Sequence, residues 1–338
     1  MTDPLALARG LVDIPSVSGE EAPVARFVAS HLTTLGYRVE LFEAAPGRPN
    51  VLATTAAPPR VVLSTHLDTV PPHIPARLAG GVLYGRGACD AKGIVAAQIA
   101  AAERLRADGM TEIGLLFVVD EEMGSLGARA ANAHPLAAQC RWLIDGEPTD
   151  NRLATGCKGS LRVTLRTEGL AAHSAYPEHG RSAVDALLDV LADVRRARWP
   201  TDPGFGETTV NIGVIAGGTR PNVVAAEARA DLQIRLVTDA QPVQALLEQA
   251  AAGRAQIEYL TAAPLLRLAT VPGFATCLVR FTTDIPHLTN WGTPLLVGPG
   301  SILHAHGEDE QISESELAAG VDTYVRLVRA LAVGRAET

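Results

Sequence analysis

Three short apolar runs in the first half of the chain each lead directly into ionisable side chains. Each run has the length and composition of a strand that is buried on both faces, as in a parallel sheet. The runs and the side chains after them are 61–63 with His66 and Asp68, 113–119 with Glu121 and Glu122, and 142–144 with Asp145 and Glu147. Because open α/β sheets hold their ligands at the carboxyl ends of the strands, we expect these side chains to converge at one edge.

The order of the expected elements changes in the middle of the chain. Elsewhere helices alternate with apolar strands, which is typical of an α/β fold. In the middle, the order β-α-β-β-α-β predicts a ferredoxin-like unit. Its strands are expected at 160–167, 209–216, 227–237 and 256–260, and its helices at 181–198 and 241–252. The sequence therefore predicts a two-domain α/β protein, in which residues 1–156 and 265–338 form one discontinuous domain and residues 157–264 form an inserted one.

Composition excludes several classes of protein. The chain has 338 residues, of which 47% are hydrophobic and 20% charged, so it is globular and long enough for two cores. A net charge of -8 without a basic run argues against a nucleic-acid partner, and no apolar stretch has the length of a membrane span. The N-terminus lacks the pattern of a signal peptide, and the four cysteines form no Cys-x-x-Cys pair. We therefore expect a cytoplasmic protein.

Two local features predict specific packing. Ser18 and Glu21 have the spacing of a capping box ahead of a helical pattern that continues to Leu35. Lys92 and Lys158 are the only lysines in a chain whose other basic residues are arginine. Lysine carries a compact charge and arginine a planar fork, so these two positions are candidates for tight sites that accept only the smaller group.

The ionisable residues suit a pair of metal ions. Besides those that follow the three runs, the chain offers Asp90 in a glycine-rich segment and two histidines, His304 and His306, before Asp309 and Glu310. Imidazoles with carboxylates favour zinc or a similar divalent ion. Two histidines and three carboxylates overfill one tetrahedral site but suit two ions that share a bridging carboxylate, with one acid left as a general base. The spacing does not decide which acid bridges.

Five motifs, in this order, make the chain resemble a known family of dinuclear zinc amidohydrolases. That family includes acetylornithine deacetylase, succinyl-diaminopimelate desuccinylase, aminoacylase and carboxypeptidase G. The motifs are His66-Leu67-Asp68-Thr69-Val70-Pro71, Tyr84-Gly85-Arg86-Gly87-Ala88 with Asp90-Ala91-Lys92-Gly93, Asp120-Glu121-Glu122 with Gly124, Gly146-Glu147-Pro148, and Gly298-Pro299-Gly300 ahead of Ala305-His306 and Asp309-Glu310. The resemblance implies a zinc-peptidase-like catalytic domain and an inserted dimerisation or lid domain.

The resemblance also implies a role for each site residue. His66 and Glu147 would bind one zinc or cobalt ion, Glu122 and His306 the other, and Asp90 both. Glu121 would be the general base that activates a bridging hydroxide, and Asp68 would lie behind His66. His306 is favoured over His304, and Glu147 over Asp145, because they match the motifs. His173 would stabilise the oxyanion from the partner subunit of a homodimer, and Asn222 and Arg235 would contact the substrate.

These roles imply hydrolysis of an N-acyl amino acid, and the C-terminal motif favours N-acetylornithine or N-acetylcitrulline, hence arginine biosynthesis. Rival substrates are an N-succinyl amino acid, a lysine or ornithine linked to a carrier protein, and a peptide cleaved by a di- or carboxypeptidase. A carrier protein would require a basic groove, for which Arg195, Arg196 and Arg198 are candidates. A non-catalytic binding protein on the same fold is the alternative from another class.

Overall fold

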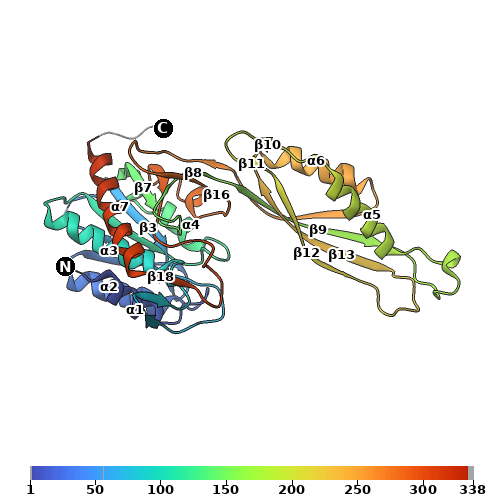
Figure 1. Cartoon of the computed structure of the whole chain (residues 1–338), viewed down its shortest axis with the longest axis horizontal. Coiled ribbons are helices and arrows are strands. Elements are labelled where there is room, and N and C mark those ends of the chain that lie inside the picture. Colours follow the sequence, from blue (N-terminus) through green and yellow to red (C-terminus); the bar gives the residue numbers. More distant parts are fainter. Residues whose placement is uncertain (1, 56, 334–338) are drawn as a thin grey trace. The chain divides into compact units, whose positions relative to one another are not determined.

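The protein consists of two compact units (Figure 1). The computed structural model describes residues 2–55 and 57–333. Unit 1 comprises Met1–Thr155, Leu268–Cys277 and Thr283–Thr338, and unit 2 comprises Gly156–Arg267 and Leu278–Thr282. The main segment of unit 2 begins and ends close to the predicted insert boundaries. Residues 278–282 also belong to unit 2, where the backbone N–H of Lys158 donates to the carbonyl of Val279.

A six-stranded mixed sheet forms the centre of unit 1. Its strand order is β1-β2-β6-β3-β7-β17, in which β6, β3, β7 and β17 run parallel to one another. The bounds are β1 Arg38–Ala45, β2 Arg48–Thr54, β3 Val61–His66, β6 Ile113–Val118, β7 Trp142–Asp145 and β17 Thr293–Leu296. Every residue of β3, β6 and β7 is buried, as the continuous apolar runs predict.

Helices cover both faces of this sheet. The helices of unit 1 are α1 Pro4–Val12, α2 Ala22–Thr34, α3 Lys92–Ala107, α4 Leu126–Asn132 and α7 Glu314–Ala332. Residues of α1, α2, α3 and α7 share one hydrophobic core with one face of the sheet, and residues of α4 share a second core with the other face. The predicted α/β class is thereby confirmed as a three-layer arrangement within unit 1.

The start of α2 differs from the sequence prediction. Glu21 is the N-cap residue, but no side chain caps this helix, so the predicted capping box is wrong. The Glu21 carboxylate instead accepts hydrogen bonds from Arg48, and the Ser18 hydroxyl donates to Asp68 at 2.7 Å. Ser18 and Glu21 therefore bind residues that are distant in sequence and not the end of the helix. A hydrogen bond with a charged partner is stronger than one with a neutral backbone N–H group.

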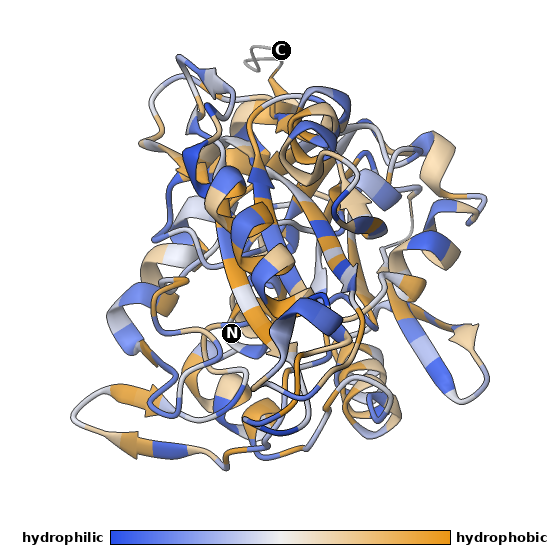
Figure 2. Cartoon of the chain, turned by 90° about the vertical axis from the view of Figure 1, so that its right-hand side faces the viewer, coloured by the Kyte–Doolittle hydropathy of each residue, from blue (hydrophilic) through white to orange (hydrophobic). Residues whose placement is uncertain are grey.

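Unit 2 has the predicted ferredoxin-like order. Its antiparallel sheet has the order β12-β13-β9-β14, and its two helices pack with that sheet around a separate core. The elements are β9 Gly159–Glu168, α5 Ala183–Arg196, β12 Thr209–Gly217, β13 Glu227–Leu236, α6 Ala240–Ala251 and β14 Gln256–Ala263. In Figure 2 the helices carry both hydrophilic and hydrophobic residues, and α5 buries Leu187, Val190, Leu191 and Val194. This is the helical spacing of an amphipathic surface helix.

The remaining strands are short. They are β4 Arg77–Ala79, β5 Val82–Tyr84, β8 Leu153–Cys157, β10 Thr201–Asp202, β11 Gly206–Glu207, β15 Leu266–Arg267, β16 Thr276–Val279 and β18 Gln311–Ser313. Single 3-10 turns lie at Ala137–Gln139, Pro177–His179 and Ile285–His287. Among the described helices, none combines the length and hydropathy that crossing a membrane requires.

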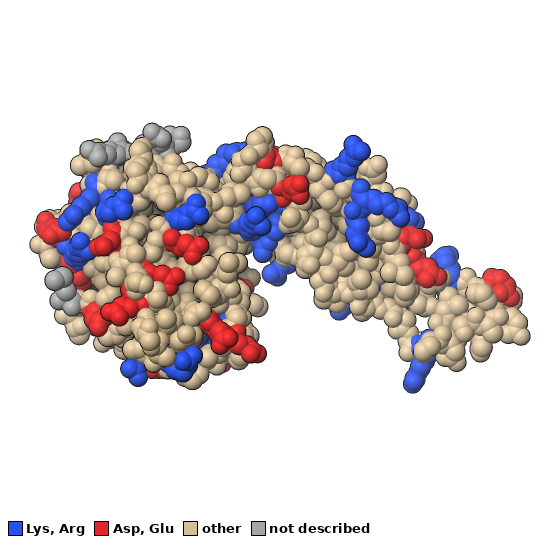
Figure 3. All heavy atoms as spheres, viewed as in Figure 1, with Lys and Arg blue, Asp and Glu red and all other residues tan. Residues whose placement is uncertain are grey.

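Both lysines are buried, so arginine supplies the basic surface drawn blue in Figure 3. Lys92 is the first residue of α3 and is 0% exposed, and its Nζ donates to the carbonyl of Ile14 at 2.6 Å. A Cβ added at Gly87 would come within 2.8 Å of the Lys92 Cδ. The aliphatic part of the Lys92 side chain is therefore tightly packed against Gly87. Burial lowers the pKa of Lys92 to about 7.

Replacing Lys92 by arginine is therefore expected to destabilise the protein. The wider guanidinium would overpack a filled site, which costs about 1–3 kcal/mol of the free energy of unfolding. Urea denaturation of Lys92→Arg measures this cost. Arg104→Lys, at an exposed pair with Asp322, is the control and should stay within about 0.5 kcal/mol of wild type. Equal stability of Lys92→Arg and wild type would contradict the tight-site interpretation.

Candidate metal centre

Three neighbouring parallel strands deliver ionisable side chains to one edge of the central sheet. His66 is the last residue of β3, Glu121 and Glu122 follow β6, and Glu147 follows β7. Because β6, β3 and β7 are adjacent and parallel, their carboxyl ends meet. The convergence expected from the sequence is present in unit 1.

Six side chains form two candidate metal-binding groups. One group is His66, Glu121 and Glu147, and the other is Asp90, Glu122 and His306. Within each group the candidate ligand atoms lie within 4.8 Å of one another. Each group combines one imidazole with two carboxylates, which is a donor set for zinc and related divalent ions.

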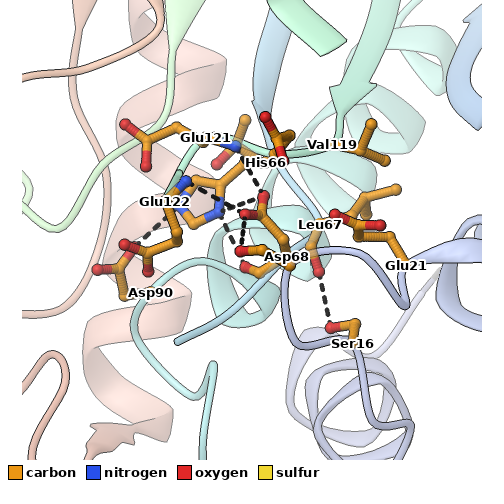
Figure 4. A network of polar contacts seen from close by, with 12 residues as sticks. Ser16, Glu21, His66, Leu67, Asp68, Asp90, Val119, Glu121 and Glu122 are labelled. Atoms are coloured by element: carbon orange, nitrogen blue, oxygen red, sulfur yellow. Dashed lines mark hydrogen bonds and ion pairs between the residues drawn. The ribbon is translucent and has the colours of Figure 1, made fainter. Parts of the chain in front are cut away.

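Asp90 connects the two groups. Its Oδ1 lies 3.0 Å from the Nε2 of His66, and its Oδ2 lies 3.4 Å from the Nε2 of His306. The same Nε2 of His306 is 2.9 Å from Oε1 of Glu122. Figure 4 shows Asp90, His66 and Glu122 turned toward one another. A carboxylate whose two oxygens face two different imidazoles has the geometry of a ligand shared by two ions.

The carboxylates of the two ligand groups require a positive charge to balance them. Burial raises the pKa of Glu121 and that of Glu147 well above the ordinary value of a glutamate. The negative charges of neighbouring acids raise both pKa values further. Hydrogen bonds with Asp90 and Glu122 raise the pKa of His306 to about 10. Buried carboxylates this close repel each other unless a cation balances them. The residues present therefore fit a pair of divalent cations.

Asp68 holds the turn that carries Glu121 and Glu122. Its Oδ1 accepts the backbone N–H of Glu121 at 3.0 Å, and its Oδ2 accepts that of Glu122 at 3.1 Å. The Nδ1 of His66 lies 3.0 Å from the Asp68 carbonyl and 3.5 Å from its Oδ1. The backbone carbonyl of Asp68 therefore makes the shorter contact with His66, and its carboxylate fixes the neighbouring acidic turn, which no sequence pattern predicts (Figure 4).

Arg48 and Asp284 also lie near the centre and are not predicted from the sequence. Arg48, in β2, donates to Oδ1 of Asp120 at 2.6 Å and also pairs with Glu21. It therefore ties the residue before Glu121 to the start of α2. Asp284 is 2% exposed, and burial raises its pKa to about 7, with His66 and Asp68 among the charges that act on it. Neither residue lies in a motif, so the sequence carried no signal for them.

The rejected alternatives lie outside the two groups. His304 is exposed, and its Nδ1 is 3.4 Å from Nε2 of Gln311. Asp145 is buried in β7 but belongs to neither group. Cys89, next to Asp90, is 0% exposed, and burial raises its pKa well above that of a free thiol. This thiol is therefore not a reactive thiolate.

The three predicted residues of unit 2 fall in two places. His173 pairs with Val223, and the N–H of Ser174 donates to the carbonyl of Asn222, so His173 and Asn222 are neighbours. The Nδ1 of His173 accepts the N–H of Ala175 at 3.1 Å, which leaves the proton of a neutral imidazole on Nε2. Arg235 lies separately on β13, opposite Ser160 of β9.

Arg235 is half-buried without an anionic partner. Among the described residues it forms no ion pair, and burial, with nearby Arg162, lowers its pKa below the usual arginine value. A guanidinium that is partly desolvated beside a like charge is poised to bind an anion, and its planar fork fits a carboxylate.

Comparisons with known proteins identify the family. The profile of peptidase family M20/M25/M40 matches residues 62–330. A peptidase M20 domain-containing protein of Schizosaccharomyces pombe is 37% identical, with 96% of this chain and 84% of that protein covered. A probable carboxypeptidase of Aspergillus clavatus is 39% identical, with 96% and 82% covered.

A solved structure agrees at the level of the fold. An M20 family metallo-carboxypeptidase of Sulfolobus solfataricus superposes with a TM-score of 0.77 at 17% identity, covering 98% of this chain and 100% of that one. The family profile and the relatives at 37% and 39% identity confirm the resemblance at the level of the family. The chain belongs to peptidase family M20/M25/M40 and is a hydrolase of the metallopeptidase type.

Proposed function

We propose that the protein hydrolyses an amide bond whose nitrogen belongs to an amino acid with a free α-carboxylate. The observation that carries this proposal is Asp90, whose two oxygens face His66 and His306 from separate ligand groups. Relatives named as probable carboxypeptidases favour the C-terminal peptide bond as the amide.

The proposed metal assignment follows the two groups. His66 and Glu147 would hold one ion, Glu122 and His306 would hold the other, and Asp90 would serve both. Bound there, two divalent ions supply Lewis-acid polarisation of the amide carbonyl and a lowered pKa for a water molecule. Zinc is the first expectation and cobalt the second, and elemental analysis of protein purified without added metal identifies the native ion.

Glu121 is the group proposed to move the proton. Its carboxylate takes a proton from the attacking water and gives it to the leaving amine nitrogen. Asp68 keeps Glu121 in place through the backbone N–H.

Unit 2 is proposed to recognise the substrate and to form a homodimer. The Nε2–H of His173 would donate to the developing oxyanion in the partner's site, and Arg235 and Asn222 would bind the substrate, with Arg235 on the α-carboxylate. In support of a dimer, β12 is an edge strand of its sheet and exposes Val214 and Ile215 by 46% and 56%.

Other substrates share the same α-carboxylate. N-Acetylornithine and N-acetylcitrulline remain candidates, as do N-succinyl-diaminopimelate and an amino acid linked to a carrier protein. For the last, Arg196 already pairs with Asp193 at 2.9 Å, which leaves Arg195 and Arg198 for an acidic partner. Intact enzyme with two bound ions that cleaves nothing would favour a binding protein on this fold.

A substrate panel tests the proposal. Enzyme loaded with zinc or cobalt is assayed on N-blocked dipeptides, on the same dipeptides amidated at the C-terminus, on N-acetylornithine and N-acetylcitrulline, and on N-succinyl-diaminopimelate. Cleavage of free-acid dipeptides but not of their amides supports the carboxypeptidase assignment. Cleavage of acetylated amino acids alone moves the protein to the deacylase branch. Equal cleavage of acids and amides contradicts recognition of the α-carboxylate.

Leu303 and Met123 are proposed to bind the acyl side of the substrate. They are the most exposed large hydrophobic residues in the described part of unit 1, at 88% and 78%. Met123 follows Glu122 in the chain, and Leu303 lies three residues before His306, so both are close in sequence to the two residues that form the 2.9 Å contact. Exposed apolar side chains beside a polar centre are typical of a binding surface.

Leu303→Ser is expected to lower kcat/KM about tenfold for a substrate with phenylalanine on the acyl side, because burying a leucine contributes about 1.5 kcal/mol. An N-acetyl substrate, which cannot reach this surface, should be unaffected. Steady-state kinetics on both substrates measures the ratio, with Leu78→Ser at an exposed leucine in β4 as the control. An equal loss for both substrates would show that Leu303 does not bind the acyl side.

A further inference from the structure

Glu310 is a fully buried carboxylate that belongs to neither ligand group. It is 0% exposed and precedes β18, on the segment that also carries His306. Burial raises its pKa, which its ion pair with Arg86 opposes. A buried carboxylate is stable only where its oxygens accept hydrogen bonds or form ion pairs, so the partners of Glu310 indicate its role.

One oxygen of Glu310 organises the backbone around Asp90. Its Oε1 accepts N–H groups from Gly87 at 2.9 Å, Cys89 at 3.3 Å and Asp90 at 3.2 Å. The glycine-rich segment therefore bends around this single atom. The position of the Asp90 Cα, and with it the reach of its side chain, depends on that oxygen.

The other oxygen leads to the His306 loop. Oε2 of Glu310 accepts from Nη1 of Arg86 at 2.6 Å. The same guanidinium donates to the carbonyls of Gly307 at 3.2 Å, His306 at 3.4 Å and Pro72 at 3.3 Å. Arg86 is 2% exposed, so this fork is held in one orientation.

We propose that the Glu310–Arg86 pair positions Asp90 against His306 and thereby builds the second of the two metal sites. This inference rests on the proposed function, because it assigns the pair a role in metal binding. The two groups differ in how they are supported. In the first group His66 ends β3, and Glu121 and Glu147 follow β6 and β7. In the second group only Glu122 follows a strand of the central sheet, whereas Asp90 and His306 lie on loops that meet through this ion pair. Asp90 serves both sites, but His306 and the loop that carries it serve only the second. Loss of the pair should therefore weaken the second site more than the first.

The test is a metal titration of the full-length Glu310→Gln protein. The amide still accepts backbone N–H groups through its oxygen but loses the charge that binds Arg86. Isothermal titration calorimetry with zinc, and visible absorption with cobalt, should show the second ion bound 10–100-fold more weakly than in wild type and the first ion weakened by a smaller factor. Arg86→Gln should give the same result, and the double variant should be no worse than either single one, as expected for residues that act as a unit.

Two controls separate positioning from general destabilisation. Trp291→Phe removes a buried hydrogen bond to the carbonyl of Ala131, away from both groups, and should lower the melting temperature while both ions bind normally. Glu310→Asp keeps the charge and should retain more of the second-site affinity than Glu310→Gln at a similar melting temperature. Equal weakening of both ions in Glu310→Gln, or no weakening at all, would overturn the inference. If wild-type protein binds no ion, the proposed function itself fails.

Discussion

Glu121→Gln is expected to reduce kcat by about 10²–10⁴-fold, the usual contribution of a general base, while both metal ions remain bound. Glutamine keeps the size of the side chain and the backbone hydrogen bond to Asp68, but it cannot take up a proton. The measurement combines steady-state hydrolysis of the best panel substrate with the metal content of the same sample. KM should change little, because the lost group acts in proton transfer and not in substrate binding.

The geometry makes this test informative. Glu121 shares a ligand group with His66 and Glu147, so it is near enough to bind an ion itself. Glu147→Gln is the matched control and should lose the ion held with His66. If Glu121→Gln loses one ion per chain as Glu147→Gln does, Glu121 is a ligand. If it keeps full turnover, Glu121 has no part in the reaction.

Asp90→Asn is expected to bind less than one ion per chain at metal concentrations that saturate wild type. The neutral amide offers a single oxygen acceptor, and its NH₂ group cannot face a cation, so both ions lose the charged ligand that they share. The loss should exceed that in Glu122→Gln, since Glu122 lies in only one group. Activity should fall below detection, because both ions depend on the residue that joins them.

Metal titrations of the two variants, in parallel with their thermal melting curves, measure this difference. Asp90 lies in a segment whose backbone is held by Glu310, so the fold around it should survive the substitution. If Asp90→Asn loses a single ion, as Glu122→Gln should, then Asp90 serves one site and the bridging assignment is wrong. If it binds two ions normally, Asp90 is not a ligand.

The central strands and the ferredoxin-like unit could be predicted from the sequence because their side-chain patterns are local. Continuous apolar runs in β3, β6 and β7 indicate burial on both faces, and the helical spacing in α5 indicates one buried face. The choice of His306 over His304 came from the motif alone. In the structure His306 lies 2.9 Å from Glu122, whereas His304 lies 3.4 Å from Gln311.

The capping box shows where local reasoning fails. Ser18 and Glu21 have the right spacing, yet Asp68 and Arg48, which are distant in sequence, bind them instead. Asp284 was missed for a related reason: its proximity to His66 and Asp68 arises only when the segment after unit 2 returns to the centre.

Sequence by itself determined the fold class, the parallel strands and the identity of the residues that converge at their ends, because hydrophobic periodicity and motif order are properties of neighbouring positions. Only the tertiary structure decided that Asp90 faces two imidazoles, that Asp68 holds the acidic turn and that Glu310 with Arg86 joins two loops. These contacts connect residues tens to hundreds of positions apart. Their partners are selected by burial and by hydrogen-bond geometry, which no local pattern encodes.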